Sequence, residues 1–373
     1  MAPRRLTTLQ LTHQGQGAGS TQSIFSLSRE LARQGHRVIV GCPPNTLLAR
    51  MLAAAPALTH VPLDFTRPRD VANAIAATIA AHDVHVVNSH ATGDRRALTW
   101  LRWRGRLPQA FVVTRRTMPL TSPPELIAVG LTADRTIAVS AAVARSLRRR
   151  LHPAGRLRIV TNGIDLERVD AEPTPAELAA VEAAVGNSGG DRPVVLVVAR
   201  RKDQDILLRA LPALERPVTV AFVGIGPDDE LRRAQAAVPP RHHIVFVPFT
   251  ERPLAFYRFA TVAALPSRIE GLSQALLEAM SLGIPVVASA AGGNAELVHP
   301  GETGLLVPPL DPAAWTRALD RLLGDAGLRQ RLARAGRTLA RGEFTMERTA
   351  SGTEAIYREA LERRQLLRGE RFR

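Results

Sequence analysis

The chain has 373 residues, of which 45% are hydrophobic and only 4% are aromatic. At about 100–200 residues per domain, this length predicts two domains whose cores are built from Ala, Val, Leu and Ile. A single cysteine, Cys42, excludes a disulfide framework and a cysteine-based metal site, and it favours a reducing cytoplasm. No run of about 18 uncharged apolar residues is present, so no membrane-spanning helix is predicted. Residues 1–10 indicate a first strand rather than a signal peptide.

The positive charge is concentrated in the first part of the chain. Residues 1–150 contain 20 arginines against 7 acidic residues, whereas residues 151–373 contain 29 basic against 27 acidic residues. A basic field on one part of a protein favours an anionic partner, such as nucleic acid, a phospholipid surface or a phosphorylated acceptor. The alternative, that an arginine-rich composition merely raises the isoelectric point, does not explain the asymmetry.

The first half of the chain alternates strands with helices. An apolar run at Leu6–Leu11 precedes three glycines and a helical pattern over Thr21–Arg33, which ends at Gly35. Further buried strands are predicted at Arg37–Val40, Val84–Val87, Phe111–Val113 and Thr136–Val139. This alternation is typical of βαβ units in a parallel sheet.

A turn-rich segment separates the two halves and predicts a linker over residues 170–192. The alternation then restarts, with strands predicted at Val194–Val198, Val218–Val223, Ile244–Val247, Val262–Leu265 and Pro285–Ala288. We therefore predict an α/β chain with two doubly wound, Rossmann-like domains over residues 1–169 and 193–352, followed by a C-terminal helix within 353–373.

Glycines at the first strand–helix turn predict that the backbone lies close to a phosphate group of a ligand. Gly15, Gly17 and Gly19 lie where the backbone can come close to an anion at a helix N-terminus. A nicotinamide-dependent oxidoreductase would also need an acidic residue at the end of the second strand, about 20 residues later. That strand ends in Val40-Gly-Cys-Pro43 without a carboxylate, so hydride chemistry is disfavoured; the simplest alternative is a tight turn.

A cationic turn follows the first strand of the second half. Arg200, Arg201 and Lys202 lie between a predicted strand end and a helix start, which suits a diphosphate. Lys202 is the only lysine of the chain, which indicates a demand for a compact ammonium group. Asp203-Gln-Asp205 resembles a metal motif, but Asp205 is predicted to cap the helix. His242-His243 has no partner at zinc spacing, so no metal site is predicted.

Two carboxylates, Glu270 and Glu278, form the strongest constellation. The first ends a loop after a predicted strand, and the second lies about one and a half turns into an otherwise apolar helix that begins near Ser273. Carboxylates beside one crevice can bind the hydroxyl groups of a sugar and a ribose. Glycine turns after neighbouring strands, at Gly224 and at Gly292-Gly293, predict further exposed backbone for a nucleotide.

With these residues in place, the sequence resembles the retaining glycosyltransferases of family 4, which have the GT-B fold. The matching segments are the E-x7-E spacing of Glu270 and Glu278, Asn162-Gly-Ile-Asp165 and Gly224-Ile-Gly-Pro227. The resemblance covers almost the whole chain and is clearest from Val194 to Leu323. It implies two domains facing across a cleft, with the C-terminal helix packed back on the first domain.

The resemblance also implies roles for individual residues. Lys202 with Arg200 or Arg201 would hold the donor diphosphate, Glu278 the ribose and Glu270 the donor sugar. The remaining donor-binding residues would be Gly17, Gly19, Gly224, Gly271, Leu272 and Ser273. The predicted catalytic residues are Glu270, His90 and Lys202, and the predicted acceptor-binding residues are Asp94, Arg115 and Arg116. Arg116 departs from the family, where relatives often have histidine, and so does the spacing of a single residue between Arg200 and Lys202.

These observations predict a glycosyltransferase that moves a sugar from a nucleotide-sugar to a hydroxyl of an anionic glycan or lipid-linked acceptor, with retention. We expect no metal and no cofactor besides the nucleotide-sugar substrate. The acceptor is predicted to be of the lipopolysaccharide or cell-envelope type, and the protein to be cytoplasmic and peripheral on the inner face of the membrane. The alternatives are a nucleotide-sugar epimerase or a sugar phosphorylase on the same fold, or a basic nucleic-acid-binding protein. The scarcity of aromatics for base stacking disfavours the last of these.

Overall fold

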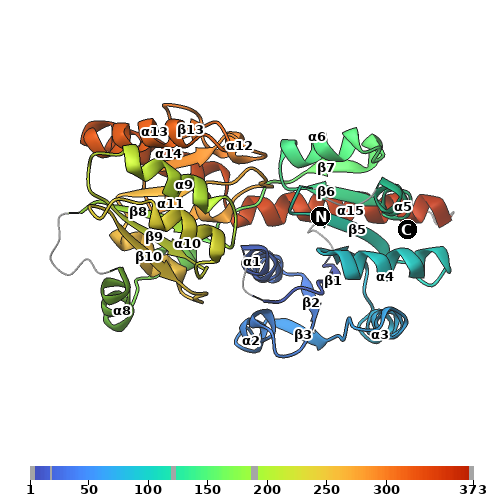
Figure 1. Ribbon diagram of the computed structural model, residues 1–373. Helices are drawn as coiled ribbons and strands as arrows, with labels where there is room; N and C mark the ends of the chain where they lie inside the picture. The colour runs from blue at the N-terminus through green and yellow to red at the C-terminus, as the bar shows by residue number, and fades with distance from the viewer. Residues whose placement is uncertain (1–4, 17–18, 119–122, 186–191, 369–373) are drawn as a thin grey trace. The chain divides into compact units, whose positions relative to one another are not determined.

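The computed structural model describes residues 5–16, 19–118, 123–185 and 192–368, and it divides into two compact units. The first unit comprises Met1–Gly163 together with Met346–Arg373, and the second comprises Ile164–Thr345. Each unit is built around one parallel sheet with helices on its faces (Figure 1). The prediction of two parallel-sheet, Rossmann-like domains is confirmed.

The first unit contains a seven-stranded sheet in the order β3-β2-β1-β4-β5-β6-β7. Its strands are β1 (Thr7–Leu11), β2 (Arg37–Cys42), β3 (Leu58–Pro62), β4 (Val86–Ser89), β5 (Ala110–Arg115), β6 (Arg135–Ala138) and β7 (Leu157–Ile159). Its helical segments are α1 (Gly19–Arg33), α2 (Leu47–Ala53), α3 (Pro68–Ala81), α4 (Thr92–Trp103), α5 (Pro123–Thr132), α6 (Ala141–Arg149), the short η1 (Ala154–Arg156) and α15 (Met346–Arg368).

The two faces of this sheet carry separate cores because successive side chains of a strand point to opposite faces. Leu9 and Val113 belong to the core that is covered by α3, α4 and α5. Val40 and Val112 belong to the other core, which is covered by α1, α2 and α15. The C-terminal helix therefore packs on the first unit, with Tyr357 fully buried against the sheet.

The second unit contains a six-stranded parallel sheet in the order β10-β9-β8-β11-β12-β13. Its strands are β8 (Val194–Val198), β9 (Thr219–Val223), β10 (His243–Val247), β11 (Val262–Leu265), β12 (Val286–Ser289) and β13 (Leu305–Val307). Its helical segments are α7 (Leu166–Asp170), α8 (Pro175–Val185), α9 (Gln204–Ala210), η2 (Leu211–Ala213), α10 (Asp229–Ala236), η3 (Pro253–Phe259), α11 (Gln274–Ser281), α12 (Asn294–Leu297), α13 (Pro312–Gly324) and α14 (Ala326–Glu343).

The segment predicted as a linker is instead partly helical, because α8 lies within residues 170–192. The side chain of Glu177 accepts a hydrogen bond from the backbone N–H of Thr174 at 2.7 Å, and the Thr174 hydroxyl accepts from the N–H of Glu177 at 3.3 Å. This reciprocal arrangement is a capping box that starts a helix. The chain passes from one compact unit to the other at Gly163–Ile164 and again at Thr345–Met346. Both points lie before the predicted ends of the two domains, at residues 169 and 352.

Candidate active site

The order of strands in the second unit reverses between β8 and β11, which are hydrogen-bonded neighbours. In open parallel sheets, ligands bind outside the carboxyl ends of the strands at such a switch point. The loop after β8 carries Lys202 and the loop after β11 carries Glu270. The Lys202 ammonium lies 2.7 Å from a Glu270 carboxylate oxygen, with the Lys202 side chain about one-third exposed. The structure therefore brings these two predicted residues together at this switch point.

Asp203 ties the same two loops to each other. Its carboxylate accepts from the backbone N–H of Arg268 at 2.8 Å and lies 2.9 Å from the Arg268 guanidinium. Asp203 is therefore engaged in holding these two loops together. Asp205 does not cap α9, contrary to expectation; instead it lies 3.5 Å from both Arg201 and Arg209. No cluster of metal ligands occurs among the residues that the structure describes.

The two arginines before Lys202 have different surroundings. Arg201 is held by carboxylates, at 2.6 Å from Asp228 and 2.5 Å from Glu230. Burial opposes its charge, but the hydrogen bond and charge of Asp228 raise the pKa of Arg201 above its usual value. Arg200 is exposed and makes no ion pair with the described residues. Of the two, Arg200 has the guanidinium that is open to a ligand.

Glu278 is buried and held by two residues of the second unit. One carboxylate oxygen lies 2.7 Å from the guanidinium of Arg168, which follows the Asn162–Asp165 turn. The other accepts weakly from the Tyr257 hydroxyl at 3.4 Å. Burial and the negative charge of Glu278 raise the pKa of Tyr257 well above its usual value, so the phenol stays protonated. These contacts fix the Glu278 carboxylate and leave part of its hydrogen-bond capacity unused.

Gly292 allows the backbone to approach Glu270. It has a φ of +54°, and a Cβ at this position would lie 1.8 Å from the Glu270 carbonyl oxygen. Any other residue would force the loop that carries Glu270 to move. Gly224, with a φ of +104°, similarly comes close to the carbonyl of Ala199 just before the cationic turn.

Three further residues of this loop were predicted to bind the donor, and all three are buried. Ser273 is buried and caps α11, because its hydroxyl accepts from the N–H of Leu276 at 3.3 Å. Gly271 and Leu272 are buried directly before it. Ser273 thus fixes the start of the helix that carries Glu278.

In the first unit, Asp94 organises the turn after β4. Its carboxylate is fully buried and accepts from the Ser89 hydroxyl at 2.5 Å and from the backbone N–H groups of His90 and Ala91, both at 2.9 Å. It also lies 3.3 Å from the His13 ring. These bonds show that Asp94 holds His13 and the backbone of His90 in place, and its predicted contact with the acceptor stays a prediction.

His90 is held by a buried polar network that the sequence did not predict. Its Nε2 lies 3.0 Å from the side-chain carbonyl of Gln10, which also accepts from Asn88 at 3.2 Å and from Tyr357 at 3.1 Å. Because a carbonyl only accepts, the proton of the neutral ring is on Nε2. Burial and the positive charge of Arg116 hold the pKa of His90 well below its ordinary value, so the ring is neutral. The only sequence signal was a buried amide, Gln10, in an apolar strand.

The two predicted acceptor arginines, Arg115 and Arg116, lie at and just after the carboxyl end of β5. Burial and the nearby charge of Arg95 lower the pKa of Arg115 to about 9. Burial lowers the pKa of Arg116 to about 10, and this side chain donates to the Asn162 side-chain oxygen at 2.7 Å. Both stay charged at neutral pH. The edge of the sheet near His90 is therefore strongly cationic.

Two predicted residues remain at the first glycine turn. Gly19 is the first residue of α1, as the predicted strand–glycine–helix pattern requires. Gly17 lies outside the described residues, so its predicted approach to the diphosphate stays a prediction.

Two doubly wound parallel-sheet units, with an ion pair at the switch point of the second, define the GT-B class of architecture. The family model of Glycosyltransferase Family 4 matches residues 17–168, and that of glycosyl transferases group 1 matches residues 192–325. The chain belongs to glycosyltransferase family 4.

Curated relatives resemble the chain over part of its length. A GDP-mannose-dependent alpha-(1-6)-phosphatidylinositol monomannoside mannosyltransferase of Mycolicibacterium smegmatis is 38% identical over 50% of this chain and 52% of its own length. A D-inositol 3-phosphate glycosyltransferase of Salinispora arenicola is 34% identical over 52% of each chain. The alignments thus span about half the length of these relatives.

Solved structures confirm the fold along nearly the whole chain. Anabaena HepE in complex with UDP-glucose has a TM-score of 0.79 at 19% identity, covering 94% of this chain and 99% of HepE. A glycosyltransferase from Rickettsia africae has a TM-score of 0.78 at 19% identity, covering 96% of this chain and all of the other. Among the described residues, no helix is both long and apolar enough to cross a bilayer.

Proposed function

We propose that this protein transfers a sugar from a nucleotide-sugar donor to a hydroxyl of an anionic acceptor, with retention of configuration. The observation that carries the proposal is the contact between Lys202 and Glu270, 2.7 Å apart at the switch point between β8 and β11. An ammonium next to a carboxylate can bind a phosphate ester and a sugar hydroxyl at the same time. Membership of family 4 supports this assignment.

In the proposed donor site, Lys202 and the exposed Arg200 neutralise the diphosphate. Glu270 accepts hydrogen bonds from the donor sugar, and Glu278 accepts from the ribose while Arg168 holds the Glu278 carboxylate in place. When the bond between the sugar and the phosphate breaks, negative charge develops on the leaving diphosphate. Fixed cations stabilise that charge, which is electrostatic catalysis.

Retention follows if the acceptor hydroxyl attacks from the face that the diphosphate leaves. Glu270 is paired with Lys202 and Glu278 with Arg168, so neither carboxylate is assigned as a nucleophile. No metal ligand enters the proposal. The neutral His90 and the cationic edge at Arg115 and Arg116 are proposed to contact the acceptor.

The acceptor is proposed to carry phosphate. The excess of arginine in residues 1–150 supports an anionic acceptor. The two relatives above are named for a phosphatidylinositol monomannoside and for D-inositol 3-phosphate, which favours a phosphate-bearing inositol or lipid head group as the acceptor. The lipopolysaccharide or cell-envelope acceptor and the location on the inner membrane face stay predictions from charge.

The test is product formation from a panel of nucleotide-sugars, including GDP-mannose and UDP-glucose, with inositol phosphate and phosphatidylinositol as acceptors. We expect an α-linked product from an α-linked donor, and at least about a hundredfold loss of turnover in Lys202→Ala. Arg331→Ala, on the exposed face of α14, is the matched control. Conversion of the donor without any acceptor would indicate an epimerase, and formation of a sugar phosphate from a glycan and added inorganic phosphate would indicate a phosphorylase.

A further inference from the structure

We infer that the first unit carries a docking face for an anionic lipid bilayer. The face is formed by Trp103, Leu131, Leu151, Leu366 and Leu367 with the arginines around them, and we call it the basic-apolar face. It lies at the amino ends of β5, β6 and β7, where α4, α5, α6 and α15 end. Figure 1 shows the ends of α4, α5 and α15 at the same end of this unit.

Large apolar side chains are exposed on this face to an unusual degree. The five side chains are between 61% and 80% exposed, and Leu151 adopts a φ of +64° directly after α6. A leucine in this left-handed conformation is strained, and glycine usually takes this position at a helix end. Both the exposure and the strain oppose stability in water, so a partner that accepts the leucine explains them better than packing does.

Side-chain contacts join these residues into one surface. The side chain of Arg156 donates to the Leu131 carbonyl at 2.6 Å, and Gly130 packs against Pro153, two residues after Leu151. Arg364 donates to the carbonyl of Pro108, which follows the turn after Trp103. The last turns of α15 therefore lie next to the ends of α4 and α5.

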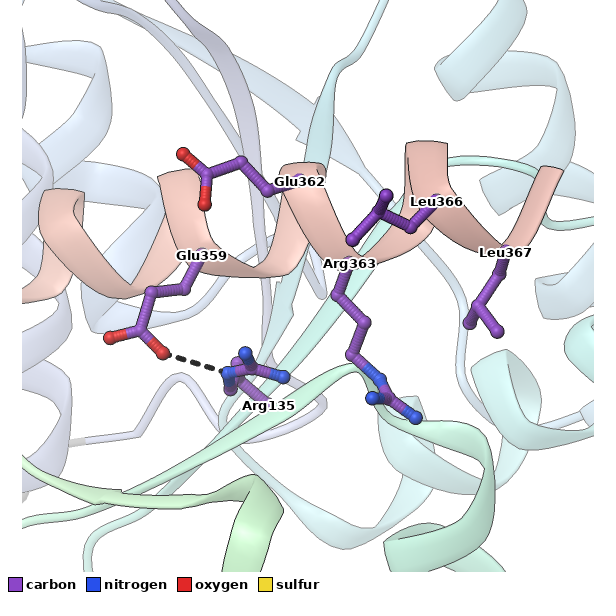
Figure 2. Close-up of a pocket in the computed structure, with 6 residues that line it drawn as sticks. All are labelled: Arg135, Glu359, Glu362, Arg363, Leu366 and Leu367. Carbon is purple, nitrogen blue, oxygen red and sulfur yellow. Dashed lines mark hydrogen bonds and ion pairs between the residues drawn. The ribbon is translucent and has the colours of Figure 1, made fainter. Parts of the chain in front are cut away.

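Leu366 and Leu367 line a shallow cavity of about 240 Å³ beside β6, with Arg135 and Arg363 (Figure 2). Glu359 is neutralised there, because it lies 2.9 Å from Arg135 and 2.8 Å from Arg158. Glu362 and Arg363 also line the cavity, so apolar side chains and charged groups occur together here.

The charge of the face is strongly positive. The arginines on and around it are Arg102, Arg104, Arg106, Arg135, Arg148, Arg149, Arg150, Arg156, Arg158, Arg363 and Arg364. The acidic residues among them are Asp134, Glu359 and Glu362, and Asp134 is already paired with Arg102 at 3.0 Å. Arg148 and Arg149 are exposed on the last turn of α6, next to Leu151.

An anionic bilayer is the occupant that fits both features. Lipid phosphates attract the arginines, and the headgroup boundary accepts leucine and tryptophan side chains. A second copy of the chain fits poorly, because a two-fold contact would place two arginine-rich faces against each other. Nucleic acid would satisfy the charge but would leave the leucines in water.

The basic-apolar face lies at the amino ends of the strands, whereas Lys202, Glu270 and His90 follow carboxyl ends. Docking through this face is therefore independent of the proposed reaction, and variants of the face should keep full activity on water-soluble substrates. This separates a failure of the docking inference from a failure of the proposed function.

The experiment is cosedimentation of the full chain with vesicles of phosphatidylglycerol and phosphatidylcholine, or of phosphatidylcholine alone, at 0.15 M salt. We expect binding only to the anionic vesicles. Arg148→Glu with Arg149→Glu should weaken it by about tenfold or more. Binding that remains at high salt should be weakened by the double change Leu366→Ser with Leu367→Ser, and also by Leu151→Ser alone.

Matched controls keep the test specific. Arg331→Glu with Arg334→Glu makes the same change in net charge on α14, and Leu310→Ser removes another exposed leucine with a φ of +61°. Both controls should bind as the unchanged protein does, and thermal melting should confirm that every variant is folded. The inference is overturned if anionic vesicles are not bound, if face and control variants bind equally, or if the leucine variants instead abolish a dimer in ultracentrifugation.

Discussion

Replacing Arg168 with methionine should destabilise the second unit, because the buried carboxylate of Glu278 would lose its ion-pair partner. The Glu278 side chain is only 8% exposed and that of Arg168 is 22% exposed, with 2.7 Å between their charged atoms. Removing one partner of a fully buried ion pair costs about 3–5 kcal/mol, because the remaining charge is left uncompensated. Since Arg168 is partly exposed, water screens the pair, and we expect about 2–3 kcal/mol.

The assay is a double-mutant cycle with Glu278→Gln, followed by urea unfolding. The double variant leaves no buried charge, so it should recover about 1–2 kcal/mol relative to Arg168→Met alone. It should not recover donor binding, because the amide cannot replace the carboxylate at the ribose. A coupling free energy below about 0.5 kcal/mol would refute the claim that the buried Glu278 carboxylate depends on Arg168 as its ion-pair partner.

Three further predictions follow from the described contacts. Arg200→Ala should raise the KM for the nucleotide-sugar by about tenfold or more, whereas Arg201→Ala should change it much less, because Arg201 is already paired with carboxylates; equal effects in steady-state kinetics would contradict this. Gly292→Ala should cost at least about 2 kcal/mol and abolish activity, while Gly301→Ala, which has a φ of +79° and open space around it, should cost only about 1 kcal/mol of backbone strain; similar melting temperatures for the two would exclude a special approach to Glu270. His90 has a depressed pKa in the folded state, so its native form binds fewer protons than the unfolded chain. The unchanged protein should therefore keep its stability above about pH 6.5 and lose it as the pH falls below that value, by up to about 1.4 kcal/mol per pH unit more than His90→Gln; parallel stability curves for the two would show that His90 is not buried in its neutral form.

The central strands could be predicted because they are buried on both faces. Val194–Val198 and Val262–Leu265 are continuous apolar runs, and the structure has strands with the same bounds. The strands that the sequence analysis missed, β3, β7 and β13, are all at sheet edges. β7 and β13 have only three residues each, and β3 contains the polar Thr59 and His60, so none of them has the long continuous apolar run of a central strand.

Local signals predicted the candidate site in part. The ammonium of Lys202 and the carboxylate of Glu270 could be placed together because each follows a strand end in a doubly wound sheet. The partners that hold the site could not be predicted, since Gln10 and Tyr357 are 347 residues apart and Arg168 and Glu278 are 110 apart. Such contacts depend on tertiary packing, which no local pattern specifies.

The most direct test of the account is calorimetric titration of a nucleoside diphosphate, GDP or UDP, into the unchanged protein and into Lys202→Ala. If the diphosphate binds beside the Lys202–Glu270 pair, loss of the ammonium should weaken binding by about 10- to 100-fold, because a hydrogen bond to a charged group contributes about 1.5–3 kcal/mol. Equal affinity of the two proteins would contradict a diphosphate site at this switch point.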